Sequence, residues 1–348
     1  MRIFAAIFAT FLLVAPASAQ IISPSEMLRS SVTNFIRPQT KAFATRTAEL
    51  SKAMYVLCEN GDLTAAQEAF AKAATAYGRI EFLRVGPLME DNRSDRILFF
   101  PDRKGIGLRQ VQQLLAEADP TAATVPGLQQ KSVAVQGFGA LEFVLFGTGF
   151  ETLTTSDGAF RCAYGAAVAK NLEEIASDIA AGWADPDGIA KRLTQPDPAY
   201  ADYRTTTESL EAIVGLVSHG IEAVRDTRIN PFIAKGDGKA NPKLALFWRS
   251  NQTLPMLKAN FDGLRRLIEL SSVVTDPALA EEVTAAFARA DAAFAVVTSP
   301  VEEAVTDPAQ AAALNDLVIA TQDLQRLIGE ELSATLGLSV GFSSLDGD

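Results

Sequence analysis

Residues 137–147 read Gly-Phe-Gly-Ala-Leu-Glu-Phe-Val-Leu-Phe-Gly, an apolar stretch with one charge inside it. That charge, Glu142, is the only ionisable residue between Lys131 and Glu151. If its side chain points inward from an apolar helix, the carboxylate must be paired, protonated or bound to a metal. Alternatively, Glu142 lies at the solvent edge of a buried helix. The stretch predicts an interior helix and marks Glu142 as a candidate functional carboxylate.

Outward from this stretch, apolar residues recur along the chain with the spacing typical of helices. Within residues 38–58, for example, Phe43, Leu50, Met54 and Leu57 follow one another at intervals of seven, four and three. We find no convincing alternation of apolar and polar residues, which would indicate strands. We predict helices over residues 38–58, 62–82 (continuing towards Gly86), 106–118, 125–146, 160–183, 200–224, 253–270, 277–297 and 308–336.

Two glycines fall inside the predicted helix over residues 125–146. Gly137 and Gly139 each cost about 1 kcal/mol relative to alanine in a helix interior. Such a cost indicates close approach of another backbone or of a bound group. The alternative is that both glycines serve only the packing of helices.

The chain divides best at residues 193–198, Leu-Thr-Gln-Pro-Asp-Pro, where two prolines interrupt the helical pattern. Residues 20–195 and 196–340 have similar lengths, and each segment holds enough helices for a bundle of three or four. We therefore predict an all-α protein of two helical bundles, with Glu142 in the first bundle. Residues 341–348 form a flexible tail rich in glycine, serine and aspartate.

The N-terminus has the form of a signal peptide. Arg2 precedes an almost wholly apolar run over residues 3–14, and the small residues Ala17-Ser18-Ala19 fit a cleavage site. We predict a signal peptide at residues 1–19, cleavage after Ala19 and a periplasmic location, with an uncleaved membrane anchor as the alternative. No later stretch reaches about 18 uninterrupted apolar residues, so we expect no membrane span in the mature chain.

The composition excludes several classes of site. A net charge of −11 and a sequence pI of about 4.8 argue against binding to nucleic acid, whose phosphates require a basic surface. A single histidine excludes a multi-histidine metal site within one chain. In an exported protein two cysteines usually pair, so we expect a disulfide between Cys58 and Cys162, with two free buried thiols as the alternative.

A second candidate group contains Glu81 and Arg84. Their i, i+3 spacing places them on one face of the predicted helix, among apolar neighbours. Arg84 would then neutralise a buried carboxylate or clamp an anionic ligand with its planar guanidinium. The alternative is a surface ion pair beside a helix end.

Trp248 and Arg249 form a third candidate group at the start of the helix predicted over residues 253–270. An aromatic ring and a guanidinium in this position could cover a pocket. Packing between domains is the commoner role for such residues. His219, the single histidine, lies in a predicted helix and is either a ligand-binding residue or a packed side chain. The sequence has no HExxH, GxSxG or phosphate-binding glycine motif, so no motif names a reaction.

Together these groups resemble the imelysin-like family of exported bacterial proteins, which includes imelysin peptidases and iron-regulated periplasmic proteins. The resemblance rests on residues 81–88, 137–142, 247–250 and 260–264, and it spans nearly all of the mature chain. It implies a fold of two helical bundles. The family hallmark is GxHxxE on a helix, whose histidine and glutamate are proposed metal ligands. In this chain the first glycine and the glutamate are present, but Gly139 stands at the histidine position.

The resemblance implies a periplasmic protein that binds a metal ion or a small ligand between its bundles, in iron or other metal acquisition. Without the motif histidine we expect a non-peptidase with no catalytic residue. The candidate ligand-binding or metal-binding residues are Glu81, Arg84, Glu142, Arg249 and Ser250.

Iron or zinc is the candidate cofactor, and a membrane transport component is the candidate protein partner. Glu81 and Glu142 could hold a hard cation with waters, or could face Arg84 or Arg249 in a buried ionic cluster. The alternatives are a zinc-dependent endopeptidase of the imelysin type and a ligand-free module that binds an outer-membrane receptor.

Overall fold

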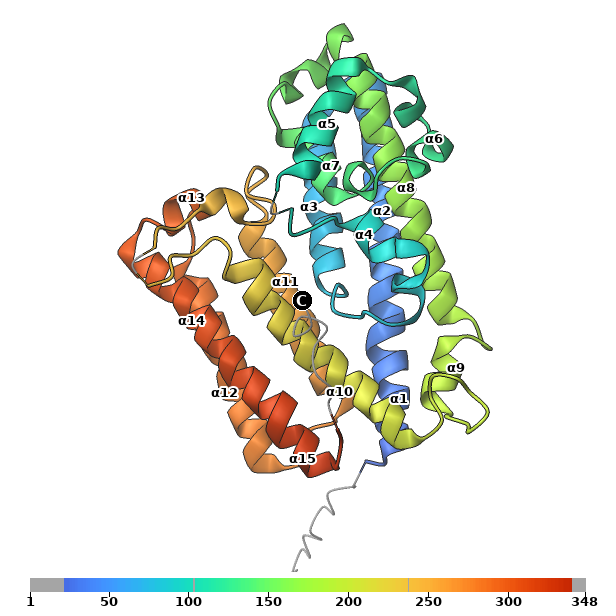
Figure 1. Ribbon diagram of the computed structural model, residues 1–348, viewed down its shortest axis with the longest axis vertical. Coiled ribbons are helices and arrows are strands. Elements are labelled where there is room, and N and C mark those ends of the chain that lie inside the picture. Colours follow the sequence, from blue (N-terminus) through green and yellow to red (C-terminus); the bar gives the residue numbers. More distant parts are fainter. Residues whose placement is uncertain (1–21, 103, 237, 340–348) are drawn as a thin grey trace, which may run out of the picture.

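The computed structural model describes residues 22–102, 104–236 and 238–339, and within these ranges it contains helices and turns but no strand. Two helical bundles stand side by side (Figure 1). The predicted all-α, two-bundle fold is therefore confirmed. The predicted signal peptide and the predicted tail at 341–348 lie outside the described residues. Across the described ranges, none of the helices combines the length and the apolar character that a membrane span requires.

The first bundle is built around three long helices, α2 (Arg37–Asn60), α3 (Leu63–Gly78) and α8 (Ala159–Ala184). The inward face of α2 carries Phe43, Leu50, Met54 and Leu57, all of them buried, as the apolar spacing predicts. The most extensive packing in the molecule joins α2 to α8. The α-helices of this half are α1 (Pro24–Ser30), α2 (Arg37–Asn60), α3 (Leu63–Gly78), α4 (Arg93–Ile97), α5 (Ile106–Glu117), α6 (Val125–Gln129), α7 (Phe138–Phe146), α8 (Ala159–Ala184) and α9 (Ile189–Thr194).

The second bundle packs α12 along α14 and α10 against the π-helical continuation of α14. It meets the first bundle where α11 packs on α3 and on the π-helical segment η1. Its α-helices are α10 (Thr206–Ala223), α11 (Thr253–Ser271), α12 (Pro277–Val296), α13 (Val301–Ala304), α14 (Pro308–Leu324) and α15 (Ser333–Leu336).

The π-helical segments of both bundles are η1 (Ser31–Ile36), η8 (Val224–Ile229) and η10 (Gln325–Leu332). The 3-10 segments are η2 (Gly86–Leu88), η3 (Glu90–Asn92), η4 (Pro120–Ala123), η5 (Val133–Val135), η6 (Phe150–Thr154), η7 (Ser156–Gly158) and η9 (Pro242–Leu244).

The prediction of one helix over residues 125–146 is wrong, because this segment divides into α6, η5 and α7. Gly137 is the residue that precedes α7, not a residue of a helix interior. A Cβ on Gly137 would lie 2.2 Å from the carbonyl oxygen of Ile97 and 2.6 Å from that of Arg96. The close approach of another backbone therefore explains this glycine, whereas a Cβ on Gly139 would meet no atom within 4 Å.

The helix predicted to run from residue 62 towards Gly86 ends earlier, at Gly78. A Cβ on Gly78 would lie 2.9 Å from both Ala259 and Met256, so α3 and α11 are in close contact at this point. The Nδ2 of Asn260 donates a hydrogen bond of 2.8 Å to the Gly78 carbonyl, which lacks a donor from its own helix once the helix ends. Glu81 and Arg84 consequently do not share a helix face.

The predicted disulfide is confirmed. Cys58 at the end of α2 is bonded to Cys162 near the start of α8, with the two Cα atoms 5.6 Å apart. The bond joins the two helices that share the most extensive packing in the molecule, at a sequence separation of 104 residues. It ties the end of α2 to the start of α8.

Candidate functional site

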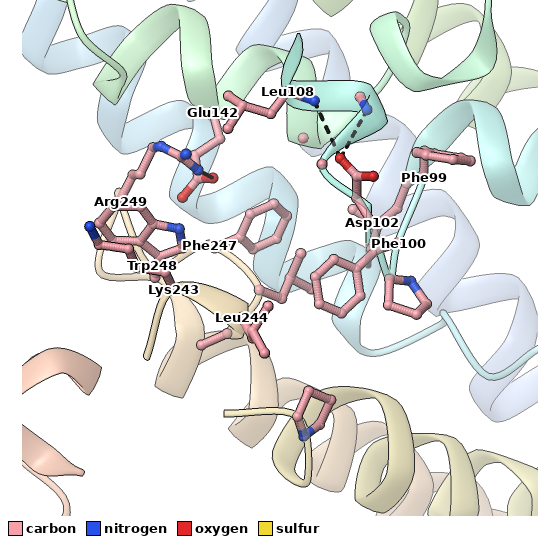
Figure 2. Close-up of a pocket in the computed structure, with 18 of the residues that line it drawn as sticks. Phe99, Phe100, Asp102, Leu108, Glu142, Lys243, Leu244, Phe247, Trp248 and Arg249 are labelled. Atoms are coloured by element: carbon pink, nitrogen blue, oxygen red, sulfur yellow. Dashed lines mark hydrogen bonds and ion pairs between the residues drawn. The ribbon is translucent and has the colours of Figure 1, made fainter. Parts of the chain in front are cut away.

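A cavity of about 460 Å³ lies where the two bundles face each other, and Figure 2 shows its lining. The first bundle contributes α7, with Glu142 and Phe143, together with the segment at 98–102. The second bundle contributes the segment at 243–249. The volume falls in the range of about 300–1,000 Å³ that small-molecule sites occupy. The fold thus brings the first and third predicted groups together in one interbundle cavity.

Glu142 points inward and is buried, so it does not lie at the solvent edge. The residue is only 4% exposed, and its Oε1 accepts hydrogen bonds from the backbone N–H of Ser250 at 3.0 Å and from the Ser250 hydroxyl at 2.9 Å. Its Oε2 lies 3.9 Å from Nη1 of Arg249. Burial raises the pKa of the Glu142 carboxyl above its usual value, and the contacts with Ser250 and Arg249 only partly offset this effect.

The turn that presents Arg249 and Ser250 has an uncommon backbone conformation. Phe247 and Asn251, on either side of it, have φ values of 59° and 56°, which place both in the left-handed region that non-glycine residues seldom adopt. The Thr253 hydroxyl donates a hydrogen bond of 2.7 Å to a backbone carbonyl preceding the turn, at residue 246. Such conformations are found preferentially at ligand-binding and catalytic sites, where the surrounding structure holds them in place.

Two cations lie against one aromatic ring in this cavity. The guanidinium of Arg249 lies 4.5 Å from the centroid of the Trp248 ring and 5.7 Å from that of Phe143. The ammonium of Lys243 lies 5.6 Å from the Trp248 centroid and has no ion-pair partner among the described residues. Figure 2 shows Arg249, Trp248 and Lys243 grouped on one side of the cavity. Trp248 therefore lines the cavity and is not merely a packing residue between domains.

The carboxylates that line the cavity are, by contrast, already engaged. Asp102 accepts hydrogen bonds from the first backbone N–H groups of α5 at distances between 2.7 and 3.3 Å (Figure 2). Asp226 forms an ion pair of 2.9 Å with Arg225 and accepts a hydrogen bond of 2.8 Å from Asn230. Glu142 is held by Ser250, as described above. The charge that remains available to a ligand in this cavity is consequently positive.

The side chains around Glu142 do not fit a resident metal ion. Across the part of the chain that the structure describes, no three His, Cys, Asp or Glu side chains gather into a group that could hold one. Gly139 lines the cavity but offers no ligand atom, and the space beside it is open. One carboxylate that already accepts two hydrogen bonds is too small a ligand set for zinc or iron.

The structure places Glu81 and Arg84 in a second cavity, of about 770 Å³. This cavity shares Phe100 and Thr227 with the first, and His219 lines it as well. Four of the five candidate residues are therefore divided between two neighbouring cavities, and Glu81 and Glu142 do not face one common site. The fifth, Ser250, lines neither cavity but holds Glu142.

Glu81 is paired with Arg228, a residue that the sequence analysis missed. Nη2 of Arg228 donates a hydrogen bond to Oε1 of Glu81, and Nδ2 of Asn260 donates one of 3.0 Å to Oε2. Burial lowers the pKa of the Arg228 guanidinium to about 10. Glu81 and Arg228 are 147 residues apart in the chain, so no local sequence pattern could have paired them.

Replacing Glu142 by glutamine should change how stability depends on pH. Since the pKa of Glu142 is raised above its ordinary value of 4.5, the native state retains this proton at a pH where the unfolded state has lost it. The contribution of Glu142 to stability is therefore fully present below a pH of about 4.5, and it is lost as the pH rises through the higher native pKa. In Glu142→Gln the amide oxygen can still accept the hydrogen bonds from Ser250, but the titration is absent.

We expect the difference between the urea midpoints of Glu142→Gln and the unmodified protein to change with pH. As the pH increases above 4.5, the variant should become more stable relative to the unmodified protein. Both proteins would be measured side by side, with the exposed Glu49→Gln as the matched control. A difference between Glu142→Gln and the unmodified protein that is constant across this pH range would contradict the raised pKa.

Comparison with known proteins places this site in a family. The family model Peptidase_M75, described as Imelysin, matches residues 36–328. The fold is similar to that of an imelysin-like protein from Psychrobacter arcticum 273-4, with a TM-score of 0.74 and 21% identity over 92% of this chain and 98% of that one. It is also similar to a protein from Parabacteroides distasonis ATCC 8503 described as an iron-regulated protein A precursor, with a TM-score of 0.67 and 14% identity over 88% and 95% of the two chains.

Among curated proteins, no sequence matches this chain significantly. The two structural similarities are below 25% identity and concern the fold alone. The family match, in contrast, extends over most of the chain and includes α7 with Glu142, the turn at 247–250 and the helix that follows it. The resemblance inferred from the sequence is therefore confirmed, and the chain belongs to the imelysin family.

Proposed function

We propose that this imelysin-family protein is an exported, periplasmic binding protein whose interbundle cavity takes a small organic anion with an aromatic body. The observation that carries this proposal is the charge balance of the 460 Å³ cavity. Its carboxylates are engaged by protein donors, whereas Lys243 lies against Trp248 with no ion-pair partner among the described residues. Arg249 also lies against Trp248, and its one carboxylate neighbour, Glu142, is 3.9 Å away and is held mainly by Ser250.

The geometry suits a ligand with two parts. An aromatic ring can pack in an offset or edge-to-face arrangement against Trp248 and Phe143, which both line the cavity. A carboxylate on that ring can accept paired hydrogen bonds from the guanidinium of Arg249, with Lys243 adding a second positive charge. Glu142 then acts as a positioning residue, because its hydrogen bonds to Ser250 hold the turn that presents Arg249.

A role in iron handling is supported by the description of the Parabacteroides distasonis neighbour as iron-regulated. Because the side chains around Glu142 do not fit a resident metal, we propose that the protein contributes by binding an organic anion and not a bare ion. The residue at position 139 also supports a non-peptidase, because Gly139 leaves the family's metal motif without its histidine ligand. A membrane transport component remains the partner that we propose for delivery of the ligand.

The test is a titration of the mature protein with 1-naphthoate, followed by the change in tryptophan fluorescence. The neutral 1-naphthalenemethanol is the matched ligand, since it keeps the ring but lacks the charge. We expect naphthoate to bind, and Arg249→Gln to weaken its affinity about ten-fold, the loss typical of one charged hydrogen-bonding group. Lys235→Gln, on an exposed lysine of the same connecting segment that does not line the cavity, should leave the affinity unchanged.

Three results would reject the proposal. One is equal affinity for naphthoate and for the neutral alcohol, and another is an Arg249→Gln variant that binds naphthoate as well as the unmodified protein. The third is stoichiometric zinc binding by the unmodified protein together with cleavage of unfolded casein that a chelator abolishes. That third outcome would establish the endopeptidase.

A further inference from the structure

The second cavity, of about 770 Å³, runs along one stripe of α10 and its π-helical continuation η8. Five pairs of adjacent residues from this helix line the cavity, and the pairs recur every four residues. The first residues of the pairs are Glu211, Gly215, His219, Ala223 and Thr227. At a rise of 1.5 Å per residue, this stripe extends for about 25 Å. The cavity is therefore a long trough and not a compact pocket.

The middle of the trough is lined by small and apolar side chains. Ala212 and Gly215 lie on the α10 side, and a Cβ on Gly215 would come near only the imidazole of His219, at 3.9 Å. Phe82 and Leu264, from the first bundle and from α11, line the opposite side. This surface suits an extended hydrocarbon chain, which gains free energy from leaving water but offers no hydrogen bonds.

One end of the trough carries positive charge that the protein does not neutralise. Arg84 is exposed there, and it has no hydrogen-bond or ion-pair partner among the residues that the structure describes. Arg84 and Arg228 both line the trough, and Arg84 lies only three residues after Glu81, the partner of Arg228. Glu81 compensates Arg228, so Arg84 is left as an unpaired cation on a chain with a net charge of −11.

Two buried polar atoms beside the trough also lack partners. Nε of Arg228 and Oδ1 of Asn260 make no hydrogen bond within the described chain, although the two residues are only 8% and 3% exposed. Such atoms are rare in native proteins, and a ligand or an ordered water at this place would give them partners. At the opposite end, the backbone N–H of Ser339 donates a hydrogen bond of 2.9 Å to Glu211, which places Ser339 at that end.

From this arrangement we infer that the trough is a second binding site, next to the naphthoate cavity, for a single-chain amphiphile with a carboxylate head, such as a long-chain fatty acid. The carboxylate binds at Arg84, and the hydrocarbon chain extends along α10 towards Glu211. The engaged carboxylate of Glu211 at the far end disfavours an amphiphile of the opposite orientation, since its head would meet a like charge.

The test uses the full mature chain and a dansyl-labelled undecanoate, whose fluorescence rises on binding. Unlabelled dodecanoate should displace the probe, whereas 1-dodecanol, with the same chain and a neutral head, should displace it at least about ten-fold less well. Arg84→Gln should weaken dodecanoate binding by a similar factor. Arg29→Gln, on an exposed arginine of α1 that does not line the trough, should not change it.

A size series at Gly215 separates filling of the trough from unfolding. Leucine favours a helix over glycine, so Gly215→Leu should not lower the thermal midpoint, while its side chain fills the trough and abolishes displacement by dodecanoate. Displacement by dodecanoate in Gly215→Ala should be weaker than in the unmodified protein and stronger than in Gly215→Leu. Equal displacement by dodecanoate and 1-dodecanol, or full binding in a folded Gly215→Leu variant, overturns the inference. Naphthoate binding in Gly215→Leu reports the first cavity separately, so that either site can fail alone.

Discussion

Glu81→Ala is expected to lower the free energy of unfolding by about 3–5 kcal/mol, the cost of leaving a buried charge without its partner. The side chains of Glu81 and Arg228 are only 15% and 9% exposed, and they join the first bundle to the second. Without Glu81, the guanidinium of Arg228 would stay buried beside Phe100, whose ring centroid lies 4.7 Å from it. Asn260 would also lose one of its two hydrogen-bond acceptors.

A double-mutant cycle in urea distinguishes the loss of the pair from the loss of packing. Glu81→Met combined with Arg228→Met should cost much less than either single change, because no buried charge is then left unpaired. The exposed pair of Arg46 and Glu49, with both side chains 47% exposed, provides the comparison. Glu49→Ala should cost less than about 1 kcal/mol. Similar losses for Glu81→Ala and Glu49→Ala would show that the interbundle pair has no special importance for stability.

Removal of the disulfide is the second change with a large expected effect. In the chain-entropy treatment, a bond that closes a loop of this length stabilises the native state by about 4–5 kcal/mol, because it restricts the unfolded chain. The bond between Cys58 and Cys162 closes a separation of 104 residues between α2 and α8. The double variant Cys58→Ala, Cys162→Ala should therefore unfold at a markedly lower urea concentration than the oxidised protein.

The effect of a reductant provides the matched control for this variant. Dithiothreitol should lower the urea midpoint of the unmodified protein to near that of the double variant, and should leave the double variant itself unaffected. If the oxidised protein and the double variant had the same midpoint, the bond would contribute nothing to the folded state. Because the disulfide holds α2 and α8 together, it should also slow the separation of these two helices when the first bundle unfolds.

Local sequence patterns predicted most of the helices, because helical periodicity is a local property. The spacing of Phe43, Leu50, Met54 and Leu57 identified the buried face of α2, and the prolines at 277 and 308 marked the starts of α12 and α14. The errors at residues 125–146 and at the end of α3 share one cause. Gly137 and Gly78 lie where a distant element comes into contact, and neither contact leaves a signal in the neighbouring residues.

The candidate residues were identified more successfully than their arrangement. The charge pattern singled out Glu142 as a buried carboxylate, and the structure shows it buried against Ser250, 108 residues away. The sequence did not indicate Lys243 or Arg228, since each is an ordinary basic residue until the fold places it. Nor did it indicate that Glu81 and Arg84 belong to a different cavity from Glu142.

The sequence by itself determined the helical class, the pairing of the only two cysteines, the family and the absence of a histidine at position 139. Each of these depends on residue identity or on neighbours within one or two turns of helix. Only the tertiary structure decided which charges are neutralised and which remain available to a ligand. The partners of Glu81 and Glu142 lie more than a hundred residues away, so the charge balance of both cavities exists only after the two bundles have packed together.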